Sequence, residues 1–112
     1  MRKFHRKTGP RRSFLKGLAD NLIMKEKITT TVARAKEIRP LVERLVSSAR
    51  QQRLADYRSL LSKLPRQSAG KLYYEIAPRY KERSGGYLRI IKESRTRKRD
   101  SAPMATIEFV KE

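Results

Sequence analysis

The charge balance is the feature of this sequence that most limits what it can fold into. The 112 residues carry 29 Lys and Arg against 11 Asp and Glu, which gives a formal net charge of +18. Like charges at this density repel one another in a compact chain, so a stable fold calls for a polyanionic partner. Nucleic acid is the expected partner, because each phosphate that Lys or Arg neutralises releases condensed counterions.

The apolar content allows one small hydrophobic core. Leu, Ile, Val and Phe account for 25 of the 112 residues, just above the roughly 20% below which a highly charged chain is expected to stay disordered. A chain of this length forms one domain. We therefore predict a single domain whose core is too small to enclose a substrate cavity.

The residue inventory argues against several classes of function. The chain has no Cys and no Trp, and His5 is its only histidine. A disulfide scaffold, a thiolate metal site and a Cys nucleophile are therefore excluded. The acidic residues are scattered, and His5 has no partner at a fixed spacing, so we expect neither an RNA-processing enzyme nor a metal or cofactor site. No apolar run is long enough to span a membrane and no signal peptide is expected.

Basic residues gather in two segments. Residues 1–12 carry six Lys and Arg and no acid, and residues 94–100 carry four Lys and Arg. Gly9 and Pro10 interrupt regular structure in the first segment, which predicts a basic arm over 1–12 that is extended and disordered until bound. The second segment predicts a basic loop at 94–103, where crowded cations repel one another unless anions lie between them.

Hydrophobic spacing predicts four helices. The first begins after Ser13 as N-cap and buries pairs of apolar residues from Phe14 to Ile23. The second runs from a Thr30 or Thr31 cap to Arg50, and Pro40 predicts a kink or break near Arg39. The third covers about 54–64, and the fourth covers about 68–77 and ends at Pro78.

Alternating apolar residues after a Gly85-Gly86 turn predict strands over 87–92 and 104–110, with 28–31 as a third. These elements predict an α+β domain over residues 13–112, with about four helices packed on a two- to three-stranded sheet and a basic N-terminal extension. Among the aromatic residues, Phe14, Tyr57 and Tyr73 lie on apolar stripes and are expected in the core. Phe4 and Tyr80 are the better candidates for contact with a partner.

Three motifs follow one another along the chain. The first is Ile28-Thr29-Thr30-Thr31 followed by Ala35-Lys36-Glu37-Ile38-Arg39, the second is Gly85-Gly86-Tyr87-Leu88-Arg89-Ile90, and the third is Ala102-Pro103-Met104-Ala105-Thr106-Ile107-Glu108-Phe109. Together, in this order, they resemble the motifs of the family of bacterial large-subunit ribosomal proteins L17. The resemblance implies an α+β structural component of the large ribosomal subunit. It implies binding to large-subunit (23S) rRNA near the peptide-exit side, beside neighbouring ribosomal proteins, in the ribosome of the cytoplasm.

The basic arm and the basic loop are the first-ranked candidates for RNA binding. Individual Lys and Arg residues elsewhere in the domain are second-ranked candidates. No enzymatic activity, small-molecule substrate or membrane is expected. A DNA-binding architectural protein remains the alternative, because it shares the charge and the size. The expected RNA-binding residues are Arg2, Lys3, His5, Arg6, Lys7, Arg11, Arg12, Lys16, Lys36, Arg39, Arg89, Lys92, Arg95, Arg97, Lys98 and Arg99.

Overall fold

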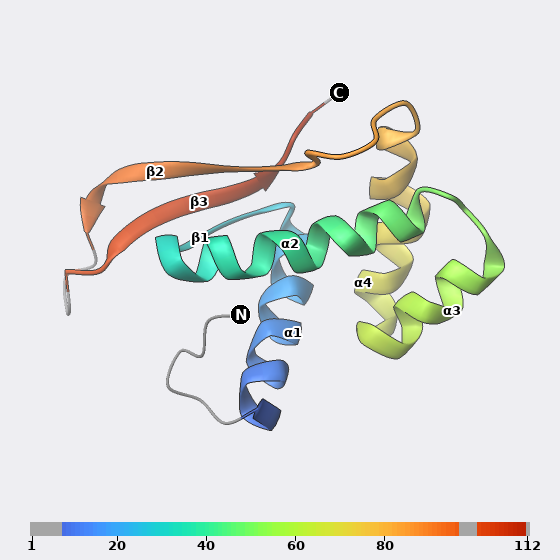
Figure 1. Cartoon of the computed structure of the whole chain (residues 1–112), viewed down its shortest axis with the longest axis horizontal. Coiled ribbons are helices and arrows are strands. Elements are labelled where there is room, and N and C mark those ends of the chain that lie inside the picture. Colours follow the sequence, from blue (N-terminus) through green and yellow to red (C-terminus); the bar gives the residue numbers. More distant parts are fainter. Residues whose placement is uncertain (1–7, 97–100, 112) are drawn as a thin grey trace.

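The computed structural model describes residues 8–96 and 101–111, with side chains from Arg12 onward apart from Arg95. The chain has an α+β fold in which four helices pack on a three-stranded antiparallel sheet (Figure 1). This confirms the fold class predicted from the sequence. The basic extension before Thr8 lies outside the described residues.

The sheet has the strand order β1-β3-β2. Strand β1 covers Lys27–Thr31, β2 covers Leu88–Thr96 and β3 covers Pro103–Phe109. Ile107 of the central strand pairs with Ile28 on one side and with Ile90 on the other. These three isoleucines therefore lie on one face of the sheet, as the alternation in the sequence predicts.

Helix α2 (Val32–Ala49) runs along this apolar face (Figure 1). The Thr31 hydroxyl caps the helix by accepting the Arg34 N–H at 3.2 Å, which confirms the predicted start. Pro40 lies inside the helix, and the helix continues on both sides of it. The expected break is therefore wrong, because buried residues on both sides, such as Ile38 and Val42, hold the helix against the core.

Helix α1 (Thr8–Lys25) begins five residues before Ser13, so Ser13 is not its N-cap and residues 8–12 are helical rather than extended. Pro10 falls in the first turn, where backbone N–H groups have no partner within the helix and proline is tolerated. The predicted apolar stripe is confirmed, since Leu15, Leu22 and Ile23 are all buried in the main core.

Helix α3 (Leu54–Lys63) lies where it was predicted. Helix α4 (Arg66–Lys71) continues through a π-helical turn, η1 (Leu72–Ile76), into a 3-10 turn, η2 (Ala77–Tyr80). Pro78 does not end this run, contrary to expectation. It lies in the first positions of the 3-10 turn, where its missing N–H leaves no hydrogen bond unmade.

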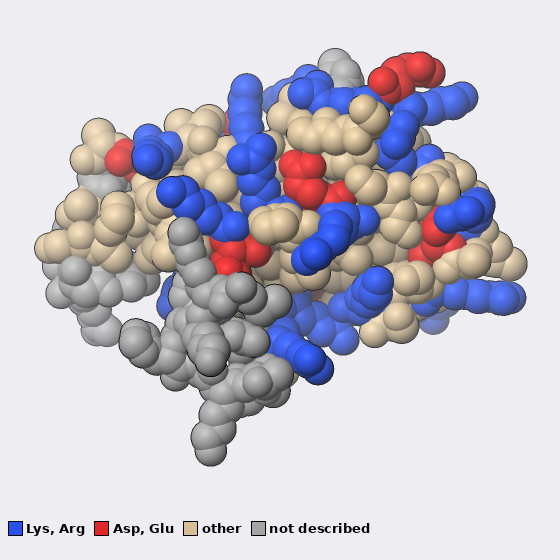
Figure 2. Space-filling model, viewed as in Figure 1, with Lys and Arg blue, Asp and Glu red and all other residues tan. Residues whose placement is uncertain are grey.

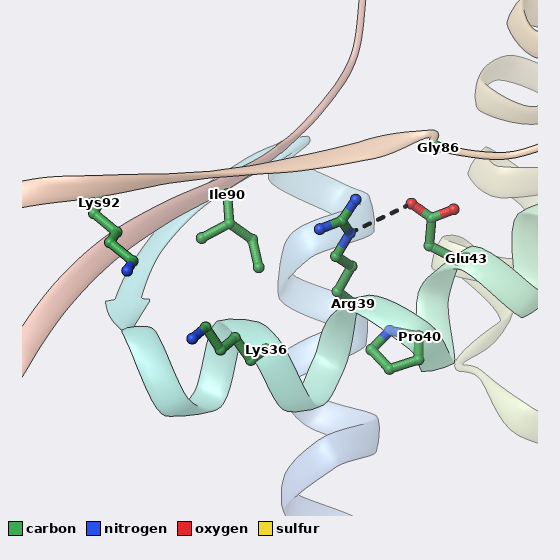
Figure 3. Close-up of a pocket in the computed structure, with 7 residues that line it drawn as sticks. All are labelled: Lys36, Arg39, Pro40, Glu43, Gly86, Ile90 and Lys92. Carbon is green, nitrogen blue, oxygen red and sulfur yellow. Dashed lines mark ion pairs between the residues drawn. The ribbon is translucent and has the colours of Figure 1, made fainter.

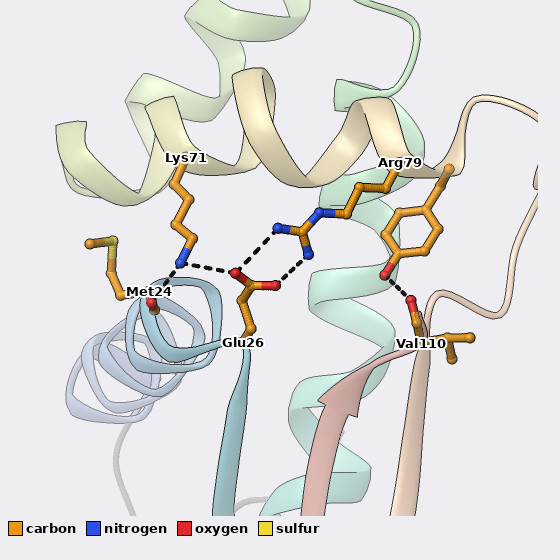
Figure 4. Close-up of polar contacts among 6 residues, drawn as sticks. Met24, Glu26, Lys71, Arg79 and Val110 are labelled. Atoms are coloured by element: carbon orange, nitrogen blue, oxygen red, sulfur yellow. Dashed lines mark hydrogen bonds and ion pairs between the residues drawn. The ribbon is translucent and has the colours of Figure 1, made fainter. Parts of the chain in front are cut away.

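A polar cluster joins the α1–β1 junction to the end of this run (Figure 4). Glu26, in the left-handed conformation with φ +64, forms an ion pair with Arg79 and a second with Lys71 Nζ at 3.2 Å. Lys71 also donates to the Met24 carbonyl oxygen at 2.7 Å. The last turn of α1, the first residue before β1 and the α4–η2 run are therefore held together by charged hydrogen bonds.

Tyr80 is fully buried, so the prediction that it contacts a partner is wrong. Its hydroxyl donates to the Val110 carbonyl oxygen, and its ring lies 5.2 Å from that of Tyr87. The 3-10 turn points the side chain inward, where it packs under the end of β3. Phe4, the other candidate, lies outside the described residues.

Candidate nucleic-acid interface

A groove of about 630 Å³ lies between α2 and the first half of β2. Figure 3 shows Lys36 and Arg39 extending from the helix, and Ile90 and Lys92 extending from the strand, toward the space between the two elements. The residues that line the groove are Lys36, Arg39, Pro40, Glu43, Gly86, Ile90 and Lys92.

Local periodicity explains why these side chains meet. Lys36, Arg39 and Glu43 follow one another at intervals of three and four residues, so they form one stripe along α2. In β2, Ile90 and Lys92 lie on the same face because successive side chains alternate. The helix stripe faces this strand because the adjacent stripe, which includes Ile38, is buried beneath the sheet.

Glu43 holds the beginning of β2 onto α2. Its carboxylate accepts the Tyr87 N–H at 3.3 Å and the Leu88 N–H at 3.0 Å. Arg39 Nε lies 3.8 Å from the same carboxylate, and the Arg39 side chain is 46% exposed. Glu43 is thus satisfied by backbone donors, whereas Arg39 keeps donors that can reach another anion.

The groove carries an excess of positive charge. Lys36 and Lys92 have no carboxylate within ion-pair distance among the residues that the structure describes. At one end, Gly86 adopts φ +65, and Arg83 Nη2 lies 3.9 Å from the position that a Gly86 Cβ would occupy. Three lining cations, with Arg83 beside them, face one carboxylate, so the groove suits an anion such as a phosphate group.

Two other predicted cations lie at a second groove. Arg12 and Lys16 of α1 line a cavity of about 570 Å³ with Lys63 of α3, above an apolar floor that includes Leu15 and Leu45. Lys63 was not among the residues predicted from the sequence. No local pattern marks it, because only the tertiary structure brings the end of α3 to the cavity that these α1 residues line.

Arg89 and Lys92 are both predicted site residues, but the strand separates them. Arg89 lies on the opposite face of the sheet from Ile90 and forms an ion pair with Glu108 at 2.7 Å. The alternation of the strand requires this separation. Arg89 therefore does not line the α2–β2 groove.

The predicted basic loop is shorter than expected. Strand β2 continues to Thr96, and Thr96 pairs with Pro103 after a register shift, so residues 94–96 and 103 are strand rather than loop. The side chain of Arg95 lies outside the described residues. The remaining predicted residues of which the structure describes no side chain are Arg2, Lys3, His5, Arg6, Lys7, Arg11, Arg97, Lys98 and Arg99.

The titratable groups with perturbed pKa values lie away from the groove. The hydrogen bond from Arg79 lowers the pKa of Glu26 below its ordinary value, while burial opposes this effect. The hydrogen bond from Arg53 likewise lowers the pKa of Asp56. Both carboxylates are held by cations in structural ion pairs, so neither has the raised pKa of a general acid.

The described part of the chain contains no group of three or more His, Cys, Asp or Glu residues placed to hold a metal ion. None of its helices is long and apolar enough to cross a membrane. Lys and Arg side chains are spread over much of the face in Figure 2, with fewer acidic side chains among them. The part of this face that the structure describes therefore carries more basic than acidic side chains.

The chain matches the family model described as ribosomal protein L17 over residues 14–110. This span contains both walls of the α2–β2 groove. Two of the three motifs that carried the resemblance, Ala35–Arg39 and Gly85–Ile90, meet there although 45 residues separate them in the sequence.

Relatives from several bacteria are similar along nearly the whole chain. Proteins named large ribosomal subunit protein bL17 from Sphingopyxis alaskensis and Fusobacterium nucleatum are each 46% identical over 110 residues, covering 97% of this chain and 78% and 94% of theirs. The protein of that name from Bdellovibrio bacteriovorus is 45% identical over 111 residues, covering 98% of this chain and 61% of its own length.

Proposed function

Because the chain belongs to the ribosomal protein L17 family, a family of structural ribosomal proteins and not of enzymes, we propose that it binds large-subunit (23S) rRNA. In this proposal the protein is a structural constituent of the large ribosomal subunit, in the ribosome of the bacterial cytoplasm. It helps to hold the folded rRNA near the peptide-exit side, beside neighbouring ribosomal proteins.

The observation that carries the proposal is the distribution of charge on a chain of this family. The net charge is +18, and Lys36, Arg39 and Lys92 converge on one groove without an equal number of carboxylates. Contacts between such cations and phosphates position a protein on RNA and follow the shape of the RNA rather than its sequence. This is the role expected of a protein that stabilises folded rRNA.

The two basic segments of the sequence extend this interface. The arm over residues 1–12 and the cations between β2 and β3 are proposed to neutralise phosphates where RNA segments approach one another closely. The ordered domain would fix where each segment enters the RNA. Lys16 and Arg12 would add contacts from the exposed side of α1.

Sedimentation tests the assignment to the large subunit. A cell lysate is washed in high salt, separated on a sucrose gradient and probed for the protein. We expect it in the large-subunit fractions at one copy per particle. Release by the wash, or sedimentation with nucleoid DNA, would contradict the proposal and support the DNA-binding architectural alternative.

A salt titration tests the basic loop. Replacing Arg95, Arg97, Lys98 and Arg99 with Ala should reduce the slope of log K against log salt for rRNA binding by roughly 0.7–0.9 for each phosphate that is no longer neutralised. The control replaces four exposed cations elsewhere with Ala and removes the same charge: Lys25, Arg58, Arg66 and Lys81. If both variants change the slope equally, the loop is not a specific part of the interface.

A further inference from the structure

We propose that the α2–β2 groove holds the sugar–phosphate backbone of one RNA segment, which passes between Lys36 on the helix and Lys92 on the strand. The inference rests on the proposed function. It adds where the RNA binds, which part of the RNA is bound, and the direction in which the RNA passes through the groove. Because the two cations stand on opposite walls, an anionic chain in the groove can be bound from both sides.

The charges of the groove favour a phosphodiester chain. Lys36 and Lys92 are both exposed and have no acidic partner in the described part of the chain. The repulsion between these cations disfavours an empty groove and is relieved when anions enter. Lysine binds phosphate as a compact point charge, so two lysines on opposite walls can neutralise successive phosphates of one strand.

Arg39 is placed to join this interaction. Its Nε is 3.8 Å from the Glu43 carboxylate, and so long an ion pair, with the arginine half-exposed, contributes little to stability. Glu43 keeps two backbone N–H donors, from Tyr87 and Leu88, whether or not Arg39 remains beside it. Arg39 can therefore turn to a phosphate without leaving Glu43 unsatisfied or loosening the start of β2.

The uncharged lining suits the sugar between two phosphates. Ile90 and Pro40 give the groove an apolar surface from the strand and from the helix. Gly86 has no side chain to narrow the end of the groove, and Arg83 lies close to it. A free phosphate ion would use the cations alone, whereas a ribose–phosphate chain also uses these apolar contacts.

Directed hydroxyl-radical probing tests the path of the RNA. The chain has no Cys, so one Cys at a time can carry an Fe(II)–EDTA probe. Lys36→Cys and Lys92→Cys place probes on the two walls, and Lys25→Cys places a control probe on the exposed end of α1. Each variant is supplied as the only copy of the protein, and cleavage of the rRNA is mapped in purified large subunits.

We expect the Lys36 and Lys92 probes to cleave the same short rRNA segment, and the Lys25 probe to cleave elsewhere or not at all. Cleavage of two unrelated segments, or no cleavage from either wall in particles that contain the protein, overturns the inference. The inference is also overturned if a crosslinking reagent attached at each of these two Cys positions reacts with a neighbouring protein. If the protein is absent from the particles, the proposed function itself fails.

The salt dependence of binding gives a second readout on the unlabelled protein and a 23S rRNA transcript. The variant Lys36→Ala with Lys92→Ala should lower the salt slope by roughly 1.4–1.8, because two phosphates are no longer neutralised. Lys25→Ala with Lys81→Ala removes the same charge from exposed positions outside the groove and should change the slope by less than half as much. Equal changes in both pairs would show that the groove contributes only general charge. Inorganic phosphate at millimolar concentration should not abolish binding of the rRNA transcript. If it does, the groove is an isolated ion site and the inference is contradicted.

Discussion

At the scale of single residues, Glu26 links several elements of the fold, and no pattern in the sequence around it predicts these contacts. It lies between α1 and β1 with φ +64, a conformation that non-glycine residues adopt at some cost. Its carboxylate pairs with Arg79 and Lys71, while its carbonyl oxygen accepts the Phe109 N–H at 3.1 Å. One side chain and its backbone thus link the α1–β1 junction to the α4–η2 run and to β3.

Glu26→Gln should lower the free energy of unfolding by about 1–2 kcal/mol. The substitution keeps the size of the side chain and the backbone preference, but removes the charge that holds Arg79 and Lys71. The carboxylate is 34% exposed, so solvent screening keeps the destabilisation below that of a buried pair. Urea unfolding measures the change, and an unchanged midpoint would show that the two cations find other partners.

The same residue predicts a dependence of stability on pH. Arg79 lowers the pKa of folded Glu26 below its ordinary value of 4.5, so the folded state favours the ionised carboxylate. This stabilisation is complete above the unfolded pKa and is lost as the pH falls through the lowered folded pKa. The difference in unfolding free energy between the native chain and Glu26→Gln should therefore shrink as the pH falls below 4.5. A difference that stays constant in acid would contradict the assignment.

At the scale of elements, the cost of a proline depends on its position in the helix. Pro10 and Pro78 lie at the starts of helical turns, where a missing N–H costs little, and neither ends its run. Pro40 is different, because it lies in the middle of α2 and leaves one carbonyl of the preceding turn without its helical donor. The helix persists there because its buried stripe is held between the sheet and α1.

Pro40→Ala should raise the free energy of unfolding by about 1–3 kcal/mol, since alanine restores the backbone donor and removes the clash with the preceding turn. Lys36→Ala, an exposed substitution in the same helix, is the control and should change stability by less than about 0.5 kcal/mol. Denaturant unfolding compares the two. Destabilisation by Pro40→Ala would show instead that the packing of α2 depends on the local geometry of proline.

At the scale of the whole molecule, self-repulsion opposes folding. The chain carries a net charge of +18 on 112 residues, and few of its cations take part in ion pairs among the described residues. Most of the other cations whose side chains the structure describes are exposed, where mobile ions or a polyanion can screen them. The free protein should therefore gain stability from any anion that reaches this surface.

Raising NaCl from about 0.05 to about 0.5 M should increase the Tm of the free protein. Screening of the net charge outweighs the weakening of the exposed ion pairs, and a gain of about 1 kcal/mol corresponds to about 4 °C or more for a domain of this size. Thermal unfolding followed by circular dichroism measures the shift. A fall in Tm would mean that the ion pairs, Glu26 with Arg79 above all, contribute more than the repulsion costs.

Features that depend on neighbours along the chain could be predicted from the amino-acid sequence. Helical spacing identified α2 and α3, and alternation identified the three strands. The charge balance predicted a polyanionic partner. These signals are local, because a buried stripe repeats every three to four residues in a helix and every two in a strand. The sequence also suggested Lys36 and Lys92 as RNA-binding residues, but it did not show that they face one another.

Which of these local features meet depends on long-range packing, so it could be seen only in the folded chain. The strand order β1-β3-β2 and the course of α2 along the sheet bring Lys36 opposite Lys92, which lies 56 residues further along the chain. The packing of η2 turned Tyr80 inward, where the sequence had suggested contact with a partner. Long-range packing decides which side chains meet and which are buried, because the burial of apolar area depends on the whole core. Periodicity indicates only which side of an element is apolar.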